Sequence, residues 1–169
     1  KTRTKMWCGC ANEFGAEPNS NVCPVCLGFP GVLPVANAEA LRLTALAGFL
    51  LNCEVTGFSK WDRKSYFYPD NPKNYQITQL DFPSTIGGRV VFELNGDLSQ
   101  VCLTRAHLEE DVGKSFHFGD CSGLDFNRAG VPLLEIVSEP DINSAEMAYE
   151  YLNALKRILE YGGVSDCDM

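Results

Sequence analysis

The 169-residue chain is poor in positive charge and has no long hydrophobic run. Its 14 lysines and arginines stand against 22 aspartates and glutamates, a net charge of −8, and an acidic surface repels phosphate backbones. No apolar run is long enough to cross a bilayer, and nothing resembles a signal peptide. We therefore expect no membrane association, and nucleic-acid contacts only through a local basic patch or a part outside this chain.

Common catalytic signatures are also missing. Only two histidines occur, without a Gly-x-Ser-x-Gly elbow or a cysteine beside an obvious base, which argues against a protease or esterase. There is neither a Gly-x-x-x-x-Gly-Lys-Ser/Thr loop nor a Gly-x-Gly-x-x-Gly fingerprint. If a nucleotide binds, we expect it on the face of a sheet.

The composition is that of one folded domain, with 45% hydrophobic and 21% charged residues. We expect a single core plus an appendage. The chain opens on a lysine rather than a methionine, and we expect it to be a piece of something longer.

Four of the eight cysteines cluster as Cys8-Gly-Cys10 and Cys23-Pro-Val-Cys26. Two closely spaced pairs on tight turns suit tetrahedral zinc, and four thiolates leave no open position for catalysis. The one-residue spacing of the first pair is shorter than usual, and free buried thiols are the alternative. The other four cysteines are scattered, which favours a metal site in a reducing cytosol over a disulfide scaffold.

Two helices follow from the hydrophobic periodicity. Asn37 suits the N-cap of a helix to about Leu51, whose apolar positions surround so much of it that we expect a buried core helix. These positions are Leu41, Leu43, Ala45, Leu46, Ala47, Phe49 and Leu50. A last helix runs from Ser144 to Gly162-Gly163. Its expected buried stripe is Ala148, Tyr151, Leu152, Leu155, Ile158 and Leu159.

Between the helices, the segment from Lys64 to Tyr68 combines a lysine with aromatic rings. Strand alternation would place Lys64, Tyr66 and Tyr68 on one face, a cradle for a nucleotide. An ordinary half-buried strand with a snorkelling lysine explains the same pattern.

A hairpin around Asn95-Gly96 leads into the most polar strand end, where Glu109 and Glu110 follow His107. Neighbouring carboxylates suit magnesium, which prefers oxygen ligands. Because alternate residues face opposite sides, Glu109 shares a face with His107 and Arg105, and Glu110 lies on the other. The alternation of side chains alone does not identify which glutamate is the magnesium ligand, and a bulge would change which of the two faces the site. The plain alternative is an acidic strand end that is exposed to water and binds no metal.

Several longer motifs are distributed over essentially the whole chain: Phe14-Gly-Ala-Glu-Pro-Asn19, Pro30-Gly-Val-Leu-Pro34, Tyr66-Phe-Tyr-Pro-Asp70, His107-Leu-Glu-Glu-Asp-Val-Gly-Lys114, Asn127-Arg-Ala-Gly-Val-Pro-Leu133, Glu135-Ile-Val-Ser-Glu-Pro-Asp141 and Gly163-Val-Ser-Asp166. Together they resemble the B subunit of the aspartyl/glutamyl-tRNA amidotransferases. The match corresponds to roughly the first third of that polypeptide.

The resemblance implies an α+β fold with a largely antiparallel sheet, packed helices and a glutamine synthetase-like cradle. Residues 1–34 would form a zinc-knuckle appendage integrated with the cradle, and residues 35–169 part of the cradle itself. The implied activity is a ligase that uses ATP and Mg²⁺ to phosphorylate the side-chain carboxylate of Glu-tRNA(Gln) or Asp-tRNA(Asn). Ammonia from an amidase, the A subunit of the same complex, would then displace the phosphate, with a small C subunit lying between the two. The expected location is cytoplasmic, in a bacterial cytosol or an organelle matrix.

The resemblance also implies roles for particular residues. Glu110 is the first choice as magnesium ligand and Glu109 the second, and both belong to the catalytic group together with Lys64 and Arg105. Lys64 and Tyr66 match nucleotide-side residues, and Tyr68 joins them. Charge on the acyl phosphate calls for cations, for which Arg105, Lys114 and Arg128 are candidates. Cys8, Cys10, Cys23 and Cys26 match the branch of the family that carries a structural zinc.

Two departures limit what this chain does alone. The family's Gly-Leu-Glu-Val-His strand, which supplies further metal ligands, would precede Lys1, and an Arg-Cys-Asp strand would follow Met169. We therefore expect this piece alone to be inactive. A zinc-stabilised binding or scaffold module without catalysis is the alternative function, and a free-standing glutamine synthetase-like kinase is a third hypothesis.

Overall fold

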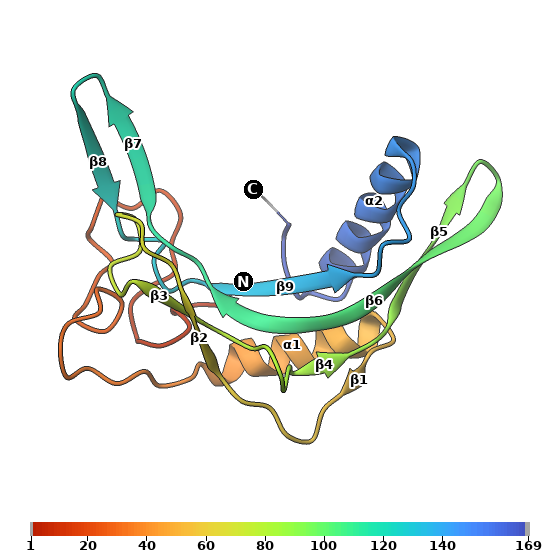
Figure 1. Ribbon diagram of the computed structural model, residues 1–169, viewed down its shortest axis with the longest axis horizontal. Coiled ribbons are helices and arrows are strands. Elements are labelled where there is room, and N and C mark those ends of the chain that lie inside the picture. Colours follow the sequence, from red (N-terminus) through yellow and green to blue (C-terminus); the bar gives the residue numbers. More distant parts are fainter. Residues whose placement is uncertain (1, 168–169) are drawn as a thin grey trace.

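One long antiparallel strand, β6, organises the chain. In the computed structural model, residues 2–167 are described, and Lys1, Asp168 and Met169 lie outside the described residues. Figure 1 shows β6 running across the molecule, with α1 alongside it and α2 near the end that pairs with β5. In chain order the elements are α1 (Ala38–Leu50), β1 (Glu54–Val55), β2 (Asp62–Ser65), β3 (Tyr75–Thr78), β4 (Thr85–Ile86), β5 (Arg89–Leu94), β6 (Asp97–Glu110), β7 (Lys114–Phe118), β8 (Cys121–Asp125), β9 (Pro132–Ser138) and α2 (Ala145–Tyr161).

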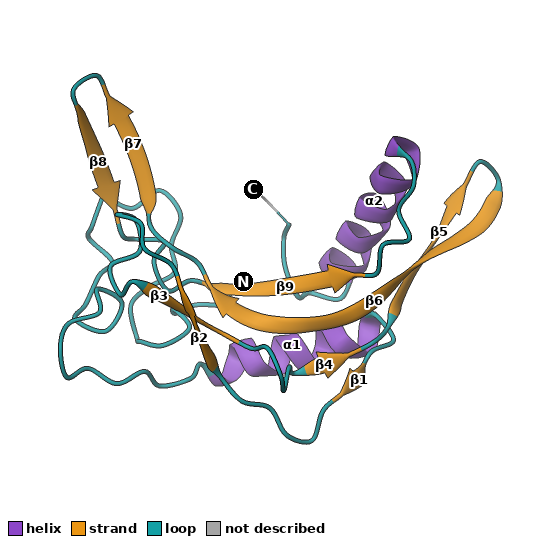
Figure 2. Cartoon of the chain, viewed as in Figure 1, coloured by secondary structure: helices purple, strands orange, loops and turns teal. Residues whose placement is uncertain are grey.

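The main sheet has the order β1-β4-β6-β5, with β9 also paired to β6, and every pairing is antiparallel. Strands β2 and β3 form a separate pair, as do β7 and β8, and the β7–β8 pair projects from the body (Figure 2). The expected α+β class with a largely antiparallel sheet is thereby confirmed. So is the hairpin between β5 and β6, where Asn95 and Gly96 both have positive φ, 56° and 91°.

A bulge in β6 decides which side chains face the helices. Opposite β9, Leu103 pairs with Ser138 but Arg105 pairs with Val137, so one extra residue is inserted on β6. Because side chains alternate along a strand, this insertion reverses the parity after Leu103. The apolar face therefore continues from Leu103 to Ala106 and Leu108, whereas Arg105, His107 and Glu109 face the opposite side.

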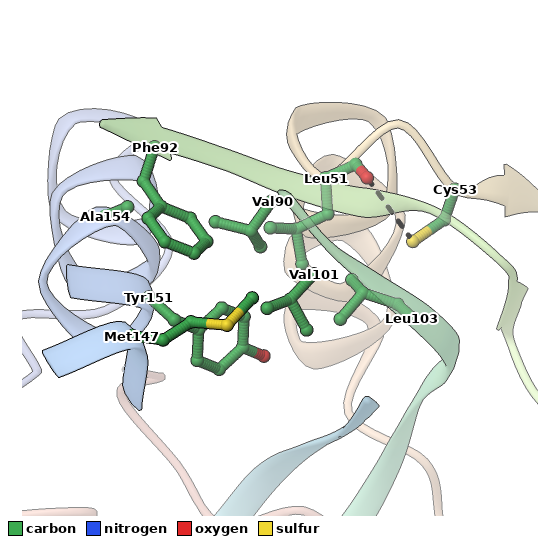
Figure 3. Packing of buried hydrophobic residues seen from close by; sticks show 9 residues of the cluster. All are labelled: Leu51, Cys53, Val90, Phe92, Val101, Leu103, Met147, Tyr151 and Ala154. Atoms are coloured by element: carbon green, nitrogen blue, oxygen red, sulfur yellow. Dashed lines mark hydrogen bonds between the residues drawn. The ribbon is translucent and has the colours of Figure 1, made fainter. Parts of the chain in front are cut away.

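The core lies between this apolar face and the helices. One cluster joins β5, β6 and α2, and Figure 3 shows Phe92, Val90 and Val101 packed against Met147 and Tyr151. A second cluster joins the two helices through Leu43, Ala47 and Leu159, and Leu134 and Ile136 of β9 pack against it. Both helices therefore close the same core.

The helix boundaries match the sequence, but two burial predictions are wrong. Asn37 caps α1 by accepting from the backbone N–H groups of Glu39 and Ala40, and Ser144 caps α2. However, α1 is not buried all round, since Leu41 is exposed and Phe49 is 68% exposed, and on α2 Leu152 is 60% exposed. The sheet covers only one side of each helix, and Met147 and Ala154 pack in the core on α2 instead.

The segment after β2 also differs from expectation. Strand β2 ends at Ser65, so Tyr66 and Tyr68 lie beyond it and strand alternation does not place them. Their rings are nevertheless neighbours, with centroids 6.2 Å apart, while Phe67 is exposed.

The N-terminal segment packs into the body of the protein. Met6 and Trp7 are buried together with Ala40, Ile77 and Leu108 in one cluster. The division into an appendage, residues 1–34, and a cradle, residues 35–169, stays a prediction, although these contacts agree with an appendage that is integrated.

Candidate active site

Three polar side chains meet on the face of β6 and β9 that points away from the helices. His107 pairs with Glu135 across the two strands, and Glu109 lies two residues further along β6. One ligand atom from each of the three lies within 4.8 Å of the others. His107 and Glu109 are buried, Glu109 with 4% of its surface exposed, whereas Glu135 is exposed. The cluster is thus a carboxylate-rich site that is open to solvent through Glu135.

Two cations flank this cluster. The Lys64 ammonium on β2 lies 3.2 Å from Glu109 Oε1. The Arg105 Nε group donates to His107 Nδ1 at 3.4 Å. The structure therefore brings Glu109, Lys64 and Arg105 together, three of the residues that the sequence singled out, although β2 and β6 are far apart along the chain.

The two carboxyls of the cluster shift each other's pKa in opposite directions. Burial, and after it the hydrogen bond to Glu135, raise the pKa of Glu109 to about 7. The same hydrogen bond lowers the pKa of Glu135. Burial lowers the pKa of His107, so its imidazole is neutral at neutral pH. A divalent cation would displace the proton that the raised pKa of Glu109 retains, since it favours ionised carboxylates.

Glu110 lies on the opposite face, as strand parity requires. It is buried, its Oε1 accepts from the backbone N–H of Ile77 at 2.8 Å, and it forms an ion pair with Lys73. Burial raises the pKa of Glu110, although Lys73 opposes this rise. The carboxylate already has partners there, so its assignment as the first magnesium ligand stays a prediction, and the geometry favours Glu109.

The remaining sequence candidates lie around this site at different distances. The pKa of Tyr66 is raised by burial and by the charge of Asp70. Lys114 begins β7, where its ammonium lies 5.0 Å from the ring centre of Phe116. Arg128 donates to the carbonyl oxygens of Val112 and Gly113 and lies 3.4 Å from Asp111. No contact of Lys114 or Arg128 with Glu109 occurs within residues 2–167.

The four cysteines converge as their spacing predicted. The Sγ atoms of Cys8, Cys10, Cys23 and Cys26 all lie within 4.8 Å of one another, and Cys26 Sγ is 3.9 Å from Cys23 Sγ. Four thiolates at about 2.3 Å from one zinc ion would lie about 3.8 Å apart, so the residues fit this metal. All eight cysteines are free thiols.

The pKa values of the thiols in this cysteine cluster favour one thiolate, a negative charge that suits a metal cation. The hydrogen bond from Cys8 and, to a smaller extent, the positive charge of Lys5 lower the pKa of Cys26 to about 4. The pKa of Cys8 is raised correspondingly, and burial raises the pKa of Cys10 to about 11. The Cys26 thiolate therefore accepts hydrogen bonds from protonated neighbours, and a metal ion would displace their protons.

Sequence reasoning missed Glu135, Lys73 and Lys5 as members of these sites. Glu135 had a usable signal, because an acid between Leu134 and Ile136 must face the side opposite the core. The two lysines had none, since a lysine is expected at the surface.

Comparison with known proteins places the whole chain in one family. A family model described as "GatB/GatE catalytic domain" matches residues 1–169. The chain is 56% identical to the B subunit of the aspartyl/glutamyl-tRNA(Asn/Gln) amidotransferase of Methylacidiphilum infernorum, over all of the chain and 37% of the relative. The corresponding protein of Caldanaerobacter subterraneus is 55% identical, over 99% of the chain and 36% of the relative. The chain thus spans little more than a third of these relatives. No helix among the described residues is long and apolar enough to cross a membrane.

Proposed function

The chain belongs to the GatB/GatE catalytic domain family, and from this premise we propose that it forms part of the catalytic cradle of an ATP-dependent tRNA amidotransferase. The cradle resembles that of glutamine synthetase, and residues 2–34 form its zinc-bearing appendage. The observation that carries the proposal is the buried Glu109 carboxyl, which meets Glu135 and Lys64 at the end of β6.

The reaction proceeds in two steps. The side-chain carboxylate of glutamate on tRNA(Gln), or of aspartate on tRNA(Asn), takes the γ-phosphoryl group of ATP and ADP leaves. The nitrogen of ammonia then forms a bond to the acyl carbon, the carbon–oxygen bond to phosphate breaks, and the amide and inorganic phosphate remain after loss of a proton. Ammonia comes from an amidase partner, the A subunit of the complex, with a small C subunit lying between them.

The chemistry of each side chain suggests its role in the reaction. Magnesium, when bound, neutralises the phosphate charge, and the carboxylate oxygens of Glu109 and Glu135 are the ligands suited to hold it. His107 lies 3.9 Å from Glu135, beyond hydrogen-bond distance, and completes the polar cluster with the two carboxylates. Lys64 has an exposed ammonium beside Glu109 that can bind the transferred phosphoryl group, and Arg105 fixes the orientation of His107.

The surroundings of the site account for the other roles. Tyr66 and Tyr68 form a pair of neighbouring rings next to β2 on which a nucleotide base can stack. Glu110 supports the site from the opposite face through Lys73, and Arg128 fixes the loop around Asp111. Lys114 stays a candidate for the phosphate side. The free thiols suit a reducing cytoplasm.

Amidation by the full-length protein with its partners tests the proposal. We expect Glu109→Gln and Lys64→Met each to lower the ATP-dependent rate by at least about 100-fold, because each removes charge that the transition state needs. Lys156→Met removes an exposed lysine on α2 and should leave the rate unchanged. Undiminished activity of Glu109→Gln would contradict the catalytic assignment and favour a binding module. Activity on free glutamate equal to that on charged tRNA would favour the free-standing kinase instead.

A further inference from the structure

A fully buried lysine lies between the cysteine cluster and the end of β6. The Lys5 side chain is 0% exposed, and its ammonium donates to the carbonyl oxygen of Phe126 at 3.1 Å. A carbonyl group is neutral, so this hydrogen bond does not balance the charge. A buried ammonium is costly unless a negative group lies beside it. The role of Lys5 therefore depends on which anion it serves.

The surroundings of Gly130 show the candidates. A Cβ atom added to Gly130 would lie 3.6 Å from Cys26 Cβ, 3.7 Å from Lys5 Cδ and 3.9 Å from Glu110 Oε2. These three side chains thus converge around one glycine. The backbone fixes this arrangement, since the N–H of Met6 donates to the Gly130 carbonyl oxygen at 2.7 Å.

Of the two anions, Glu110 already has its own cation. Lys73 forms an ion pair with Glu110, and the backbone N–H of Ile77 donates to the same carboxylate. Cys26, by contrast, lies with Lys5 against Gly130, and among the described residues the hydrogen-bond partners of its Sγ are cysteines, not another lysine or an arginine. Cys26 is thus the partner that lacks a cation apart from Lys5.

We propose that Lys5 is the charge-balancing residue of the metal centre formed by Cys8, Cys10, Cys23 and Cys26. Four thiolates around one Zn²⁺ carry two net negative charges, and the buried ammonium offsets part of them without ligating the metal. This inference rests on the zinc in the proposed function. Lys5 is a positioning residue, and its hydrogen bond to the Phe126 carbonyl oxygen holds its ammonium beside the metal centre.

Zinc affinity tests this role directly. The full-length protein, with its partner subunits, is titrated against a chromophoric zinc chelator at pH 7.5, and the zinc dissociation constant is obtained for each variant. We expect Lys5→Met, which keeps the length of the side chain but not its charge, to weaken zinc binding about 10- to 100-fold. Lys5→Arg should lose less, and the exposed Lys156→Met should match the unsubstituted protein.

Repeating the zinc titration in the Glu110→Gln variant distinguishes whether Lys5 serves the thiolates or the Glu110 carboxylate. If Lys5 serves the thiolates, Lys5→Met weakens zinc binding equally in the presence of Glu110→Gln. An unchanged zinc dissociation constant for Lys5→Met, or a loss that disappears in the Glu110→Gln background, would overturn the proposal. Absence of zinc from the unsubstituted protein would refute the zinc assignment itself, whereas zinc bound equally by both proteins refutes only the role of Lys5.

A measurement on the unsubstituted protein covers the case in which Lys5→Met does not fold. Limited acetylation with mass spectrometry compares the zinc-loaded protein with the protein after zinc removal. We expect Lys5 to be protected in the loaded form and modified after removal, with Lys156 modified equally in both. Equal modification of Lys5 in the two forms would overturn the proposal.

Discussion

The Glu109 carboxyl should make the metal-free protein less stable at high pH than a neutral isostere would. Glu109 is 4% exposed, and its pKa is raised from the ordinary 4.5 to about 7, mainly by burial. The folded protein therefore keeps this carboxyl protonated where the unfolded chain ionises it. Its contribution to stability is complete below pH 4.5 and is lost as the pH rises through about 7.

The size of the effect follows from the two pKa values. At about 1.4 kcal/mol per pH unit, the rise corresponds to about 3 kcal/mol at pH 8. The lowered pKa of Glu135 acts below pH 4.5, and the shifted pKa values of His107 and Glu110 contribute to the stability of both proteins, so the difference between Glu109→Gln and the unsubstituted protein reports on Glu109. The amide of Glu109→Gln can donate to Glu135 as the protonated acid does. We expect this variant to match the unsubstituted protein near pH 4.5 and to be up to about 3 kcal/mol more stable at pH 8.

Hydrogen–deuterium exchange of peptides that cover β6 and β9 measures this difference locally. The full-length protein is compared with Glu109→Gln from pH 5 to pH 8, in buffer without magnesium and with zinc retained. Glu93→Gln, an exposed change on β5, is the matched control and should show no pH-dependent difference. A stability difference between Glu109→Gln and the unsubstituted protein that does not grow with pH would refute the reasoning. The same variant should be inactive, a gain in stability at the expense of function.

Three further changes test the fold and the metal centre. Gly88→Ala should unfold the protein or destabilise it by more than about 3 kcal/mol in thermal unfolding. The reason is that φ at Gly88 is +105° and the added Cβ would lie 2.5 Å from Cys53 Sγ and 2.7 Å from the Leu51 carbonyl oxygen. A loss of stability below about 1 kcal/mol would contradict this. Cys23→Ser should abolish stoichiometric zinc in elemental analysis and lower the unfolding temperature, and full zinc retention would exclude the four-cysteine site. Asn37→Ala should cost about 1 to 2 kcal/mol in denaturant unfolding, since the side chain caps α1 and also donates to the Lys5 carbonyl oxygen; an unchanged midpoint would contradict its role as cap.

Local sequence signals determined the elements of this fold. The caps at Asn37 and Ser144 and the turn at Asn95-Gly96 lie where the residues predicted them, because each depends on side chains within a few positions. The cysteine spacing likewise predicted a cluster that the structure brings together. Burial was less predictable, and Phe49 is exposed because periodicity marks an apolar position without saying what covers it.

The polar site itself was decided by the tertiary structure. Its residues come from β2, β6 and β9, and only the pairing of these strands brings Lys64 and Glu135 to Glu109. The bulge after Leu103 reverses the parity of β6, and no residue near it signals that insertion. The buried lysine Lys5 is the extreme case, because its position depends on long-range contacts with Phe126 and the cysteine cluster. Sequence alone thus determined which groups the protein has, the caps of its two helices and the turn of one hairpin, whereas long-range packing decided which face each acid occupies and which charge it meets.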